Sequence, residues 1–224
     1  MKEARRKKYK TLSEYDSKRL LSEYGIPVTR EKLVKSQKDA VTAAEEIGYP
    51  VVIKACGPDL THKTELDAIR LNLADARSVR QAVKDLKTAT KGQKLQGLLV
   101  QEMVKGQREL VMGLIRDQQF GPCVMFGLGG IYTEILKDVS FRVAPLTERD
   151  ALEQMDEIKG KKILEAFRGM AEVDRQLLAK ALVALGKIGL DHDDVKEIDI
   201  NPLILSKEGN PVAVDALVVI NGKK

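Results

Sequence analysis

Several residue types and patterns are scarce or missing in this sequence of 224 residues. It has two cysteines, Cys56 and Cys123, without a CxxC spacing, which excludes a disulfide framework and a cysteine-based zinc site. The longest apolar runs, such as 216–220, are far too short to span a bilayer. The first ten residues, MKEARRKKYK, lack the apolar core of a secretory signal. We therefore expect neither a membrane protein nor a secreted one, and a reducing cytoplasmic setting is the simplest interpretation.

The common sequence motifs of nucleotide-binding and hydrolytic enzymes are also missing. The sequence has no GxxxxGK[ST], no GxGxxG between a strand and a helix, no HExxH and no GxSxG. If this protein binds a nucleotide, it must use another architecture.

The net charge of +5 is concentrated at one end of the chain. Residues 1–10 carry six Lys or Arg and one acid, whereas residues 11–224 hold 32 basic and 32 acidic side chains. The pattern predicts a basic amino-terminal tail and no nucleic-acid-binding face. Such a tail is most often a solvated terminus, and contact with an acidic partner is the alternative.

Strand and helix patterns alternate along the remaining chain, with no repeat and no Gly/Ser-rich or Pro-rich linker. This mixture, with an antiparallel pair at its end, predicts an α+β (mixed α/β) fold. Helices are expected over 12–24, 37–47, 75–88, 148–155, 161–168 and 174–188. Strands are expected over 51–54, 68–73, 98–104, 109–115 and 123–126, and a hairpin over 195–205 and 211–220 that turns at 208–210.

The last hairpin carries the clearest chemical pattern. In the segment 197–201, period-two geometry places Glu197, Asp199 and Asn201 on one face of a strand. If the turn is centred near residues 208–209, Asp215 falls opposite Asn201. Carboxylate and amide oxygens that converge in this way suit Mg²⁺ together with phosphates. The alternative is a polar sheet face turned to water, although a lone Asp in the run VAVDALVVI seldom lies there without a partner.

Three further features are ambiguous when taken alone. Lys54 follows a buried strand and can hold phosphate oxygens, or it is a lysine on the rim of a sheet. His62 lies in a loop of polar composition, where an imidazole can act as a nucleophile toward phosphorus or can simply be exposed. The segment 127–130 (GLGG) can bring backbone N–H groups to an anion, or it is a flexible turn.

In their order along the chain, these pieces resemble an ATP-grasp domain. More narrowly, they are similar to the β subunit of ADP-forming acyl-CoA (acetyl-CoA) synthetases, the group that includes succinyl-CoA synthetase. The resemblance runs from about residue 12 to residue 220. The segments that carry it are YGIPV (24–28), IGYPVVIKA (47–55), LTHKTE (60–65), LLVQEMVKGQREL (98–110), FGLGGIYTEILKDVSFRVAPL (126–146), EIDINPL (197–203) and AVDAL (213–217).

The resemblance implies two lobes that grip ATP between them, in a domain of residues 11–224. The small lobe would comprise about 25–97, and the large lobe about 11–24 with 98–224. By motif position, Lys54 would contact the phosphates, and Glu102 to Val104 would form the hinge strand that contacts adenine, largely through backbone groups. Glu109 would lie near the ribose, and Gly129 and Gly130 at the phosphate end. Asp199, Asn201 and Asp215 fall where the family holds Mg²⁺.

The resemblance also implies a reaction, acyl-CoA + ADP + phosphate ⇌ carboxylic acid + CoA + ATP. His62 matches a phosphohistidine on a mobile loop, which carries the phosphoryl group between a CoA-binding α subunit and ADP. The chain has no CoA-binding domain, so a hetero-oligomer with α is expected. A second departure is that residues 66–69 lack a Gly-Gly pair that some relatives have. Two alternatives remain: a stand-alone ATP-grasp carboxylate ligase and a non-catalytic ATP-sensing subunit.

Overall fold

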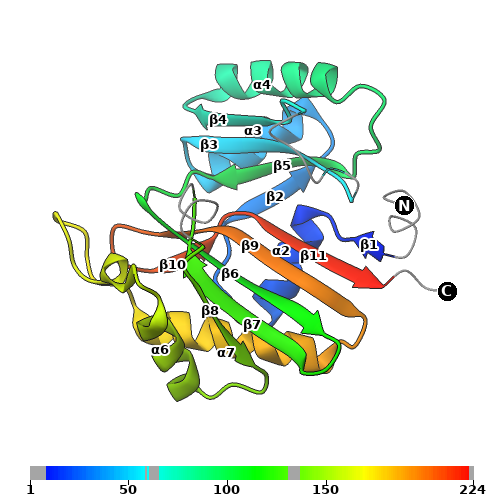
Figure 1. Ribbon diagram of the computed structural model, residues 1–224. Coiled ribbons are helices and arrows are strands. Elements are labelled where there is room, and N and C mark those ends of the chain that lie inside the picture. The colour runs from blue at the N-terminus through cyan, green and yellow to red at the C-terminus, as the bar shows by residue number, and fades with distance from the viewer. Residues whose placement is uncertain (1–8, 59, 61–65, 131–136, 222–224) are drawn as a thin grey trace. The chain divides into compact units, whose positions relative to one another are not determined.

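The computed structural model describes residues 9–58, 60, 66–130 and 137–221. The chain forms two compact units (Figure 1). Unit 1 comprises Met1–Lys10, Ser17–Val28 and Val104–Lys224, and unit 2 comprises Thr11–Asp16 and Thr29–Met103. Each unit has its own antiparallel sheet with helices packed on it, which confirms the expected α+β fold. Among the described helices, none is long and apolar enough to cross a membrane.

Unit 2 is built on a four-stranded antiparallel sheet in the order β2-β5-β3-β4. Its strands are β2 (Glu31–Val34), β3 (Val51–Cys56), β4 (Ile69–Leu73) and β5 (Gly97–Glu102), and its helices are α3 (Gln37–Ile47) and α4 (Ala76–Ala89). The strand expected over 98–104 therefore ends at Glu102. The side chain of Ser36 accepts a hydrogen bond from the N–H of Asp39 and so begins α3. Asp75 and Ser78 form a capping box that begins α4.

The two helices of unit 2 pack on one face of its sheet. Ala44 and Ile47 of α3 share a core with Val83 of α4 and with Val51 and Ile53 of β3. Because side chains alternate along a strand, Val52, Lys54 and Cys56 point to the opposite face, and these three residues are buried as well. Part of that opposite face is covered by residues 11–16, which unit 2 includes.

Unit 1 is built on a larger antiparallel sheet in the order β1-β11-β9-β6-β7-β8, with β10 also paired to β9. The strands are β1 (Tyr9–Thr11), β6 (Arg108–Asp117), β7 (Gly121–Leu128), β8 (Val139–Val143), β9 (Val195–Leu205), β10 (Pro211–Ala213) and β11 (Ala216–Asn221). The helices are α2 (Glu14–Glu23), whose first three residues belong to unit 2, α6 (Glu148–Glu157), the 3₁₀ helix η1 (Lys161–Leu164) and α7 (Arg175–Asp191).

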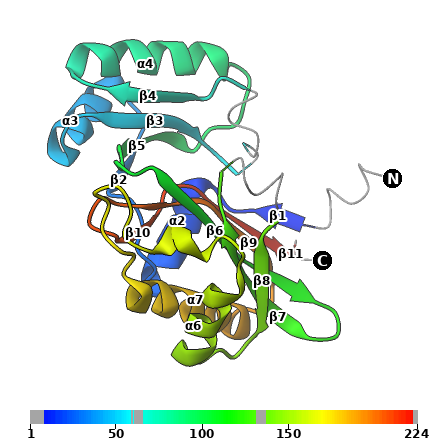
Figure 2. The same cartoon turned by 60° about the vertical axis from the view of Figure 1, so that its left-hand side comes forward.

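Helices α6 and α7 cover one face of this sheet (Figure 2). The side-chain amide of Gln154 on α6 donates to the carbonyl of Val124 over 3.1 Å. Gly186 and Gly189 let α7 approach β6 and β7, because a Cβ on Gly189 would lie 2.5 Å from the side chain of Leu114. On the uncovered face, Ile115, Phe141 and Val143 are about half exposed, while Asp199 lies further along the same face.

The helix expected over 161–168 is wrong beyond its first turn. Only Lys161–Leu164 is helical, as a 3₁₀ helix, and a tight turn with positive φ at Arg168 (47°) and Gly169 (78°) follows. The guanidinium of Arg108 donates to the carbonyls of Ile163, Glu165 and Ala171. These carbonyl groups therefore bind a distant strand residue in place of helical N–H groups. Periodicity in the sequence gives no information about such a long-range contact.

Candidate functional site

Strand β9 places its polar residues as the alternating sequence predicts. Ile198 and Ile200 are buried on the helix-covered face of the sheet. Glu197 and Asn201 are exposed, and Asp199 is half-buried. These three residues share the opposite face, because successive side chains of a strand alternate between the two faces.

The returning strand brings Asp215 beside Asn201. On one side of it Ala213 pairs with Leu203, and on the other side Ala216 pairs with Ile200. Both ladders have the same register, so Asp215, in the two-residue gap between β10 and β11, lies opposite Asn201. Asp199 therefore stands two residues from Asn201 on the same face, and all three predicted metal ligands converge at one place on the sheet.

The surroundings of Asp199 disfavour its negative charge. Burial, together with the negative charges of Glu197 and Asp215, raises the pKa of Asp199 to about 6. On the neighbouring strand β6 the residue paired with Asp199 is Gly113, where a Cβ would lie 2.5 Å from the carbonyl oxygen of Ile198. Glu197 and Asp215 thus oppose the ionisation of Asp199, and a cation bound nearby would favour it.

The donor set fits a hard divalent cation. Asp199 and Asp215 offer carboxylate oxygens and Asn201 an amide oxygen, which are the ligands that Mg²⁺ prefers when phosphates and water complete its shell. Within the described ranges no group of three or more His, Cys, Asp or Glu residues is arranged to hold a metal. A set with two carboxylates is the kind that Mg²⁺ shares with substrate phosphates.

Lys54 lies in unit 2 and is engaged in a buried ion pair. It is the fourth residue of β3 and is only 4% exposed. Its Nζ donates to Oε1 of Glu14, at the start of α2, over 2.6 Å, and the two side chains are 5% and 1% exposed. Neither interpretation of Lys54 from the sequence foresaw a carboxylate partner, and Lys54 is not a lysine on an exposed rim.

Glu109 and the glycine pair lie together in unit 1. The N–H of Gly129 donates to the carbonyl oxygen of Glu109 over 2.9 Å. A Cβ on Gly129 would lie 2.6 Å from the carbonyl oxygen of Leu110, and one on Gly130 would lie 2.6 Å from Oε2 of Glu109. Gly130 also has a φ of +61°. Glycine at these positions therefore avoids a Cβ that would crowd the backbone at Leu110 and the carboxylate of Glu109.

The segment expected to form the hinge strand begins at the end of β5. The carboxylate of Glu102 accepts hydrogen bonds from the backbone N–H and the Nε of Arg30, both over 2.8 Å. Its side chain is therefore engaged, and its backbone N–H donates to the carbonyl oxygen of Arg30 over 3.0 Å. Met103 and Val104 follow without regular secondary structure. His62 lies outside the described residues.

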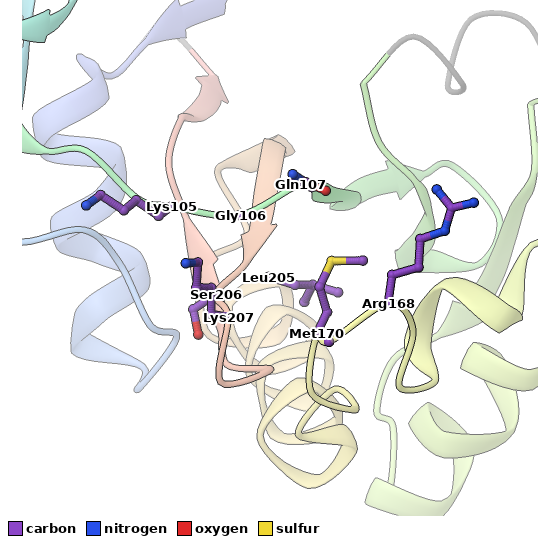
Figure 3. A pocket seen from close by; sticks show the side chains of 9 residues that line it. Lys105, Gly106, Gln107, Arg168, Met170, Leu205, Ser206 and Lys207 are labelled. Atoms are coloured by element: carbon purple, nitrogen blue, oxygen red, sulfur yellow. The ribbon is translucent and has the colours of Figure 1, made fainter.

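The structure holds a pocket that includes none of the predicted site residues. It has a volume of about 370 Å³ and lies in unit 1, between the residues that precede β6, the end of β9 and the turn at 168–170. Met170 and Leu205 lie at its centre, whereas the side chains of Lys105 and Arg168 extend away from each other (Figure 3).

Sequence reasoning missed two residues of α2. Glu14 pairs with Lys54, and Nζ of Lys18, which is completely buried, donates to the carbonyl oxygen of Val214 over 3.2 Å. In the sequence these residues stand among other charges of an amphipathic helix. The only signal available was their spacing: both fall on the face that Leu21 also shares, and that face is buried.

Comparison with known proteins shows close similarity over nearly the whole chain. A family model described as an ATP-grasp domain matches residues 3–220. The β subunit of an ADP-forming acetate–CoA ligase I from Pyrococcus furiosus is 43% identical over 213 residues, which cover 93% of this chain and 91% of that subunit. An ADP-forming acetate–CoA ligase I from Archaeoglobus fulgidus is 40% identical over 90% of this chain, but the match spans only 30% of that longer protein.

A solved structure shows the same similarity in three dimensions. It is an acetyl-coenzyme A synthetase 1 from Candidatus Korarchaeum cryptofilum in complex with coenzyme A and Mg-AMPPCP, with its phosphohistidine segment pointing towards the nucleotide binding site. The sequence identity is 40% and the TM-score 0.82, over 92% of this chain and 91% of that one.

Proposed function

This chain belongs to the ATP-grasp family and, within it, to the β subunits of ADP-forming acyl-CoA synthetases, and from this membership we propose that it is the nucleotide-binding subunit of such an acid–thiol ligase. The reaction is acyl-CoA + ADP + phosphate ⇌ carboxylic acid + CoA + ATP. The observation that carries the proposal is the convergence of Asp199, Asn201 and Asp215 on one face of the β9–β10–β11 hairpin. A half-buried carboxylate among other acids is costly unless a cation completes the site.

We propose that the nucleotide is held by charges of both signs on the chain. Lys54 supplies a fixed ammonium for the phosphate oxygens, and Asp199, Asn201 and Asp215 hold Mg²⁺. Bound there, Mg²⁺ neutralises negative charge on the phosphates that are transferred. Glu109 serves the ribose, the backbone from Glu102 to Val104 serves the adenine, and the N–H groups around Gly129 and Gly130 serve the phosphates.

His62 is proposed as the phosphoryl carrier. A neutral ring nitrogen attacks the γ-phosphorus of ATP, a P–N bond forms, the bond to the ADP oxygen breaks, and ADP leaves with the electron pair. In the direction of ATP formation the same bonds are exchanged in reverse. The support is the position of His62 in the LTHKTE segment, and the phosphohistidine segment described for the similar Korarchaeum protein.

A CoA-binding α subunit is the proposed partner. The Pyrococcus relative is called a β subunit, and the Archaeoglobus relative carries a matching region as 30% of a longer protein. The rest of that longer protein is the part that a separate α subunit would supply for this chain. We also propose a cytoplasmic location, which agrees with the two free cysteines, Cys56 and Cys123.

The test is reconstitution. The purified chain is mixed with a CoA-binding α subunit, Mg²⁺, ADP, phosphate and acetyl-CoA, and ATP formation is followed by luminescence. We expect ATP only when both chains are present, and none when His62→Ala or Asp199→Asn replaces the native chain. The Pyrococcus β subunit with its own partner serves as the positive control for the assay. ATP formation by the His62→Ala protein at the native rate would refute the carrier role and favour a direct ligase mechanism.

A further inference from the structure

Helix α2 buries two charged residues that the proposed reaction does not use. Glu14 is 4% exposed and Lys18 is 0% exposed. They stand four residues apart, about one helical turn, so they share a face of the helix. A buried charge is costly unless it has a partner, and the partners of Glu14 and Lys18 therefore show what the helix holds in place.

Glu14 holds the ammonium group of Lys54. Nζ of Lys54 donates to Oε1 of Glu14 over 2.6 Å, with side chains that are 5% and 1% exposed. Strand β3 fixes the backbone of Lys54 and Glu14 fixes the far end of its side chain. A buried ion pair is often no more stabilising than apolar residues of the same volume, so stability alone does not account for this pair. A fixed ammonium is what recognition of a phosphate oxygen requires.

Lys18 holds the backbone next to Asp215. Its Nζ donates to the carbonyl oxygen of Val214 over 3.2 Å, and the N–H of Val214 donates to the carbonyl oxygen of Pro202 over 3.1 Å. The adjacent residue on the helix, Ser17, accepts a hydrogen bond at Oγ from the N–H of Val218 over 3.1 Å. Asp215 lies in the gap between β10 and β11, so the two hydrogen bonds of Val214 fix the stretch that the ladders leave out, and the hydrogen bond of Val218 holds β11 beyond it.

We propose that α2 is a positioning element for the nucleotide site. Glu14 orients the ammonium of Lys54 for the phosphates, and Lys18 orients the backbone that presents Asp215 to Mg²⁺. Both residues act through another residue and neither touches the nucleotide. This inference rests on the proposed function, because it takes Lys54 as a phosphate ligand and Asp215 as a metal ligand.

The first test measures the dissociation constant of Mg·AMPPCP for the full chain by calorimetry, with the melting temperature recorded for each variant. Glu14→Ala removes the partner of Lys54, and we expect the affinity to fall by about 10- to 100-fold, the loss typical of one charge-assisted hydrogen bond. Glu14→Gln keeps the size and one acceptor oxygen, and should weaken binding by no more than about 3-fold. Glu23→Gln is the matched control, since Glu23 lies on the same helix with a side chain that is 64% exposed.

A double-variant cycle separates positioning from general stability. If Glu14 acts through Lys54, adding Glu14→Ala to Lys54→Met should not weaken Mg·AMPPCP binding further. An equal loss in both backgrounds would overturn the role of Glu14. Glu14→Gln replaces Glu14→Ala in the cycle if the alanine variant is unfolded at the assay temperature, and then an effect of equal size in both backgrounds would again overturn it.

The second test addresses Lys18 through the Mg²⁺ requirement. For Lys18→Met we expect the Mg²⁺ concentration at half-maximal AMPPCP binding to rise about 3- to 10-fold, the range for a modest coupling energy between neighbouring groups. Lys180→Met, the same substitution at an exposed position of α7, should leave it unchanged. If Lys18→Met does not fold, Lys18→Gln, a polar and uncharged replacement, takes its place. An unchanged Mg²⁺ requirement in the folded variant overturns the role of Lys18.

Two variants of the proposed ligands separate this inference from the proposed function. Lys54→Met and Asp215→Asn are titrated with Mg·AMPPCP in the same series. If both bind as the native chain does, the proposed function has failed. If both lose binding while Glu14→Ala and Lys18→Met keep it, only the positioning role has failed.

Discussion

Two charged residues, the buried Lys54 in unit 2 and the half-buried Asp199 in unit 1, are held in opposite ways. Lys54 on β3 meets a carboxylate of its own protein, Glu14, at 2.6 Å. Asp199 on β9 is partly buried and is repelled by the negative charges of Glu197 and Asp215, and its pKa is raised to about 6. The difference is that the protein itself supplies a countercharge to Lys54, whereas the charges that act on Asp199 oppose its ionisation. Four predictions test this contrast.

The largest effect is expected from breaking the complete pair. Lys54→Met leaves the Glu14 carboxylate buried without its cation, and we expect the free energy of unfolding to fall by about 3–5 kcal/mol. Urea unfolding of the metal-free chain measures the change. Combining Lys54→Met with Glu14→Gln should recover much of the loss, because the remaining buried group is then neutral. If Lys54→Met alone is as stable as the native chain, the buried Glu14 carboxylate does not depend on Lys54 as its counterion.

The acidic part should respond to its missing cation. Mg·AMPPCP at a hundredfold excess over its dissociation constant should stabilise the native chain by about 2.7 kcal/mol through mass action. Thermal unfolding with and without the ligand measures this shift. Asp199→Asn should show a much smaller shift at the same concentrations. Equal shifts for both proteins would mean that Asp199 takes no part in binding.

Removing the charge of Asp199 should stabilise the metal-free chain. The pKa of Asp199 is raised in the folded state from 3.8 to about 6, so its ionisation costs stability as the pH rises through this window, and the full cost is present above pH 6. In EDTA at pH 8, Asp199→Asn should therefore raise the free energy of unfolding by an amount on the order of 1 kcal/mol, reduced by partial exposure. The two proteins should converge below pH 4. A constant difference across pH 4–8 would contradict the assignment.

The smallest effect is expected at an exposed ion pair. Arg149 and Glu153 lie one turn apart on α6 at 2.9 Å, with side chains 86% and 54% exposed. Solvent screens such a pair, so Glu153→Gln should leave the free energy of unfolding unchanged within the error of the measurement. Urea unfolding in low and high salt is the measurement. A loss as large as that of Lys54→Met would show that the change in the free energy of unfolding does not depend on whether the ion pair is buried.

The site that the sequence predicted best is the one held by local geometry. The alternation of the segment 197–201 and the turn at 208–210 fix which residues share a face and which lie opposite each other, and the structure places Asp215 opposite Asn201. Helix α3 also has the predicted bounds, because Ser36 and Gly48 mark its ends. Each of these features depends on residues that lie near one another in the sequence.

The features that sequence reasoning missed depend on contacts between distant residues. Glu14 and Lys54 are 40 positions apart, and Lys18 and Val214 are 196 apart. No periodicity reports such a pair. Strands β2 and β8 were missed because both are short: β2 (EKLV) has four residues that do not alternate, and β8 (VSFRV) alternates over only five, with Phe141 and Val143 exposed. His62 lies outside the described residues, and its role stays a prediction.

The central claim is that this chain passes a phosphoryl group between a nucleotide and its own histidine. The most direct measurement is incubation of the purified chain with Mg²⁺ and ATP labelled in the γ-phosphate, followed by assay of the protein for acid-labile, base-stable label. We predict label on the native chain and none on His62→Ala, with native Mg·AMPPCP affinity in both. Equal labelling of the two proteins, or no label on the native chain even when the CoA-binding α subunit is present, would contradict the account.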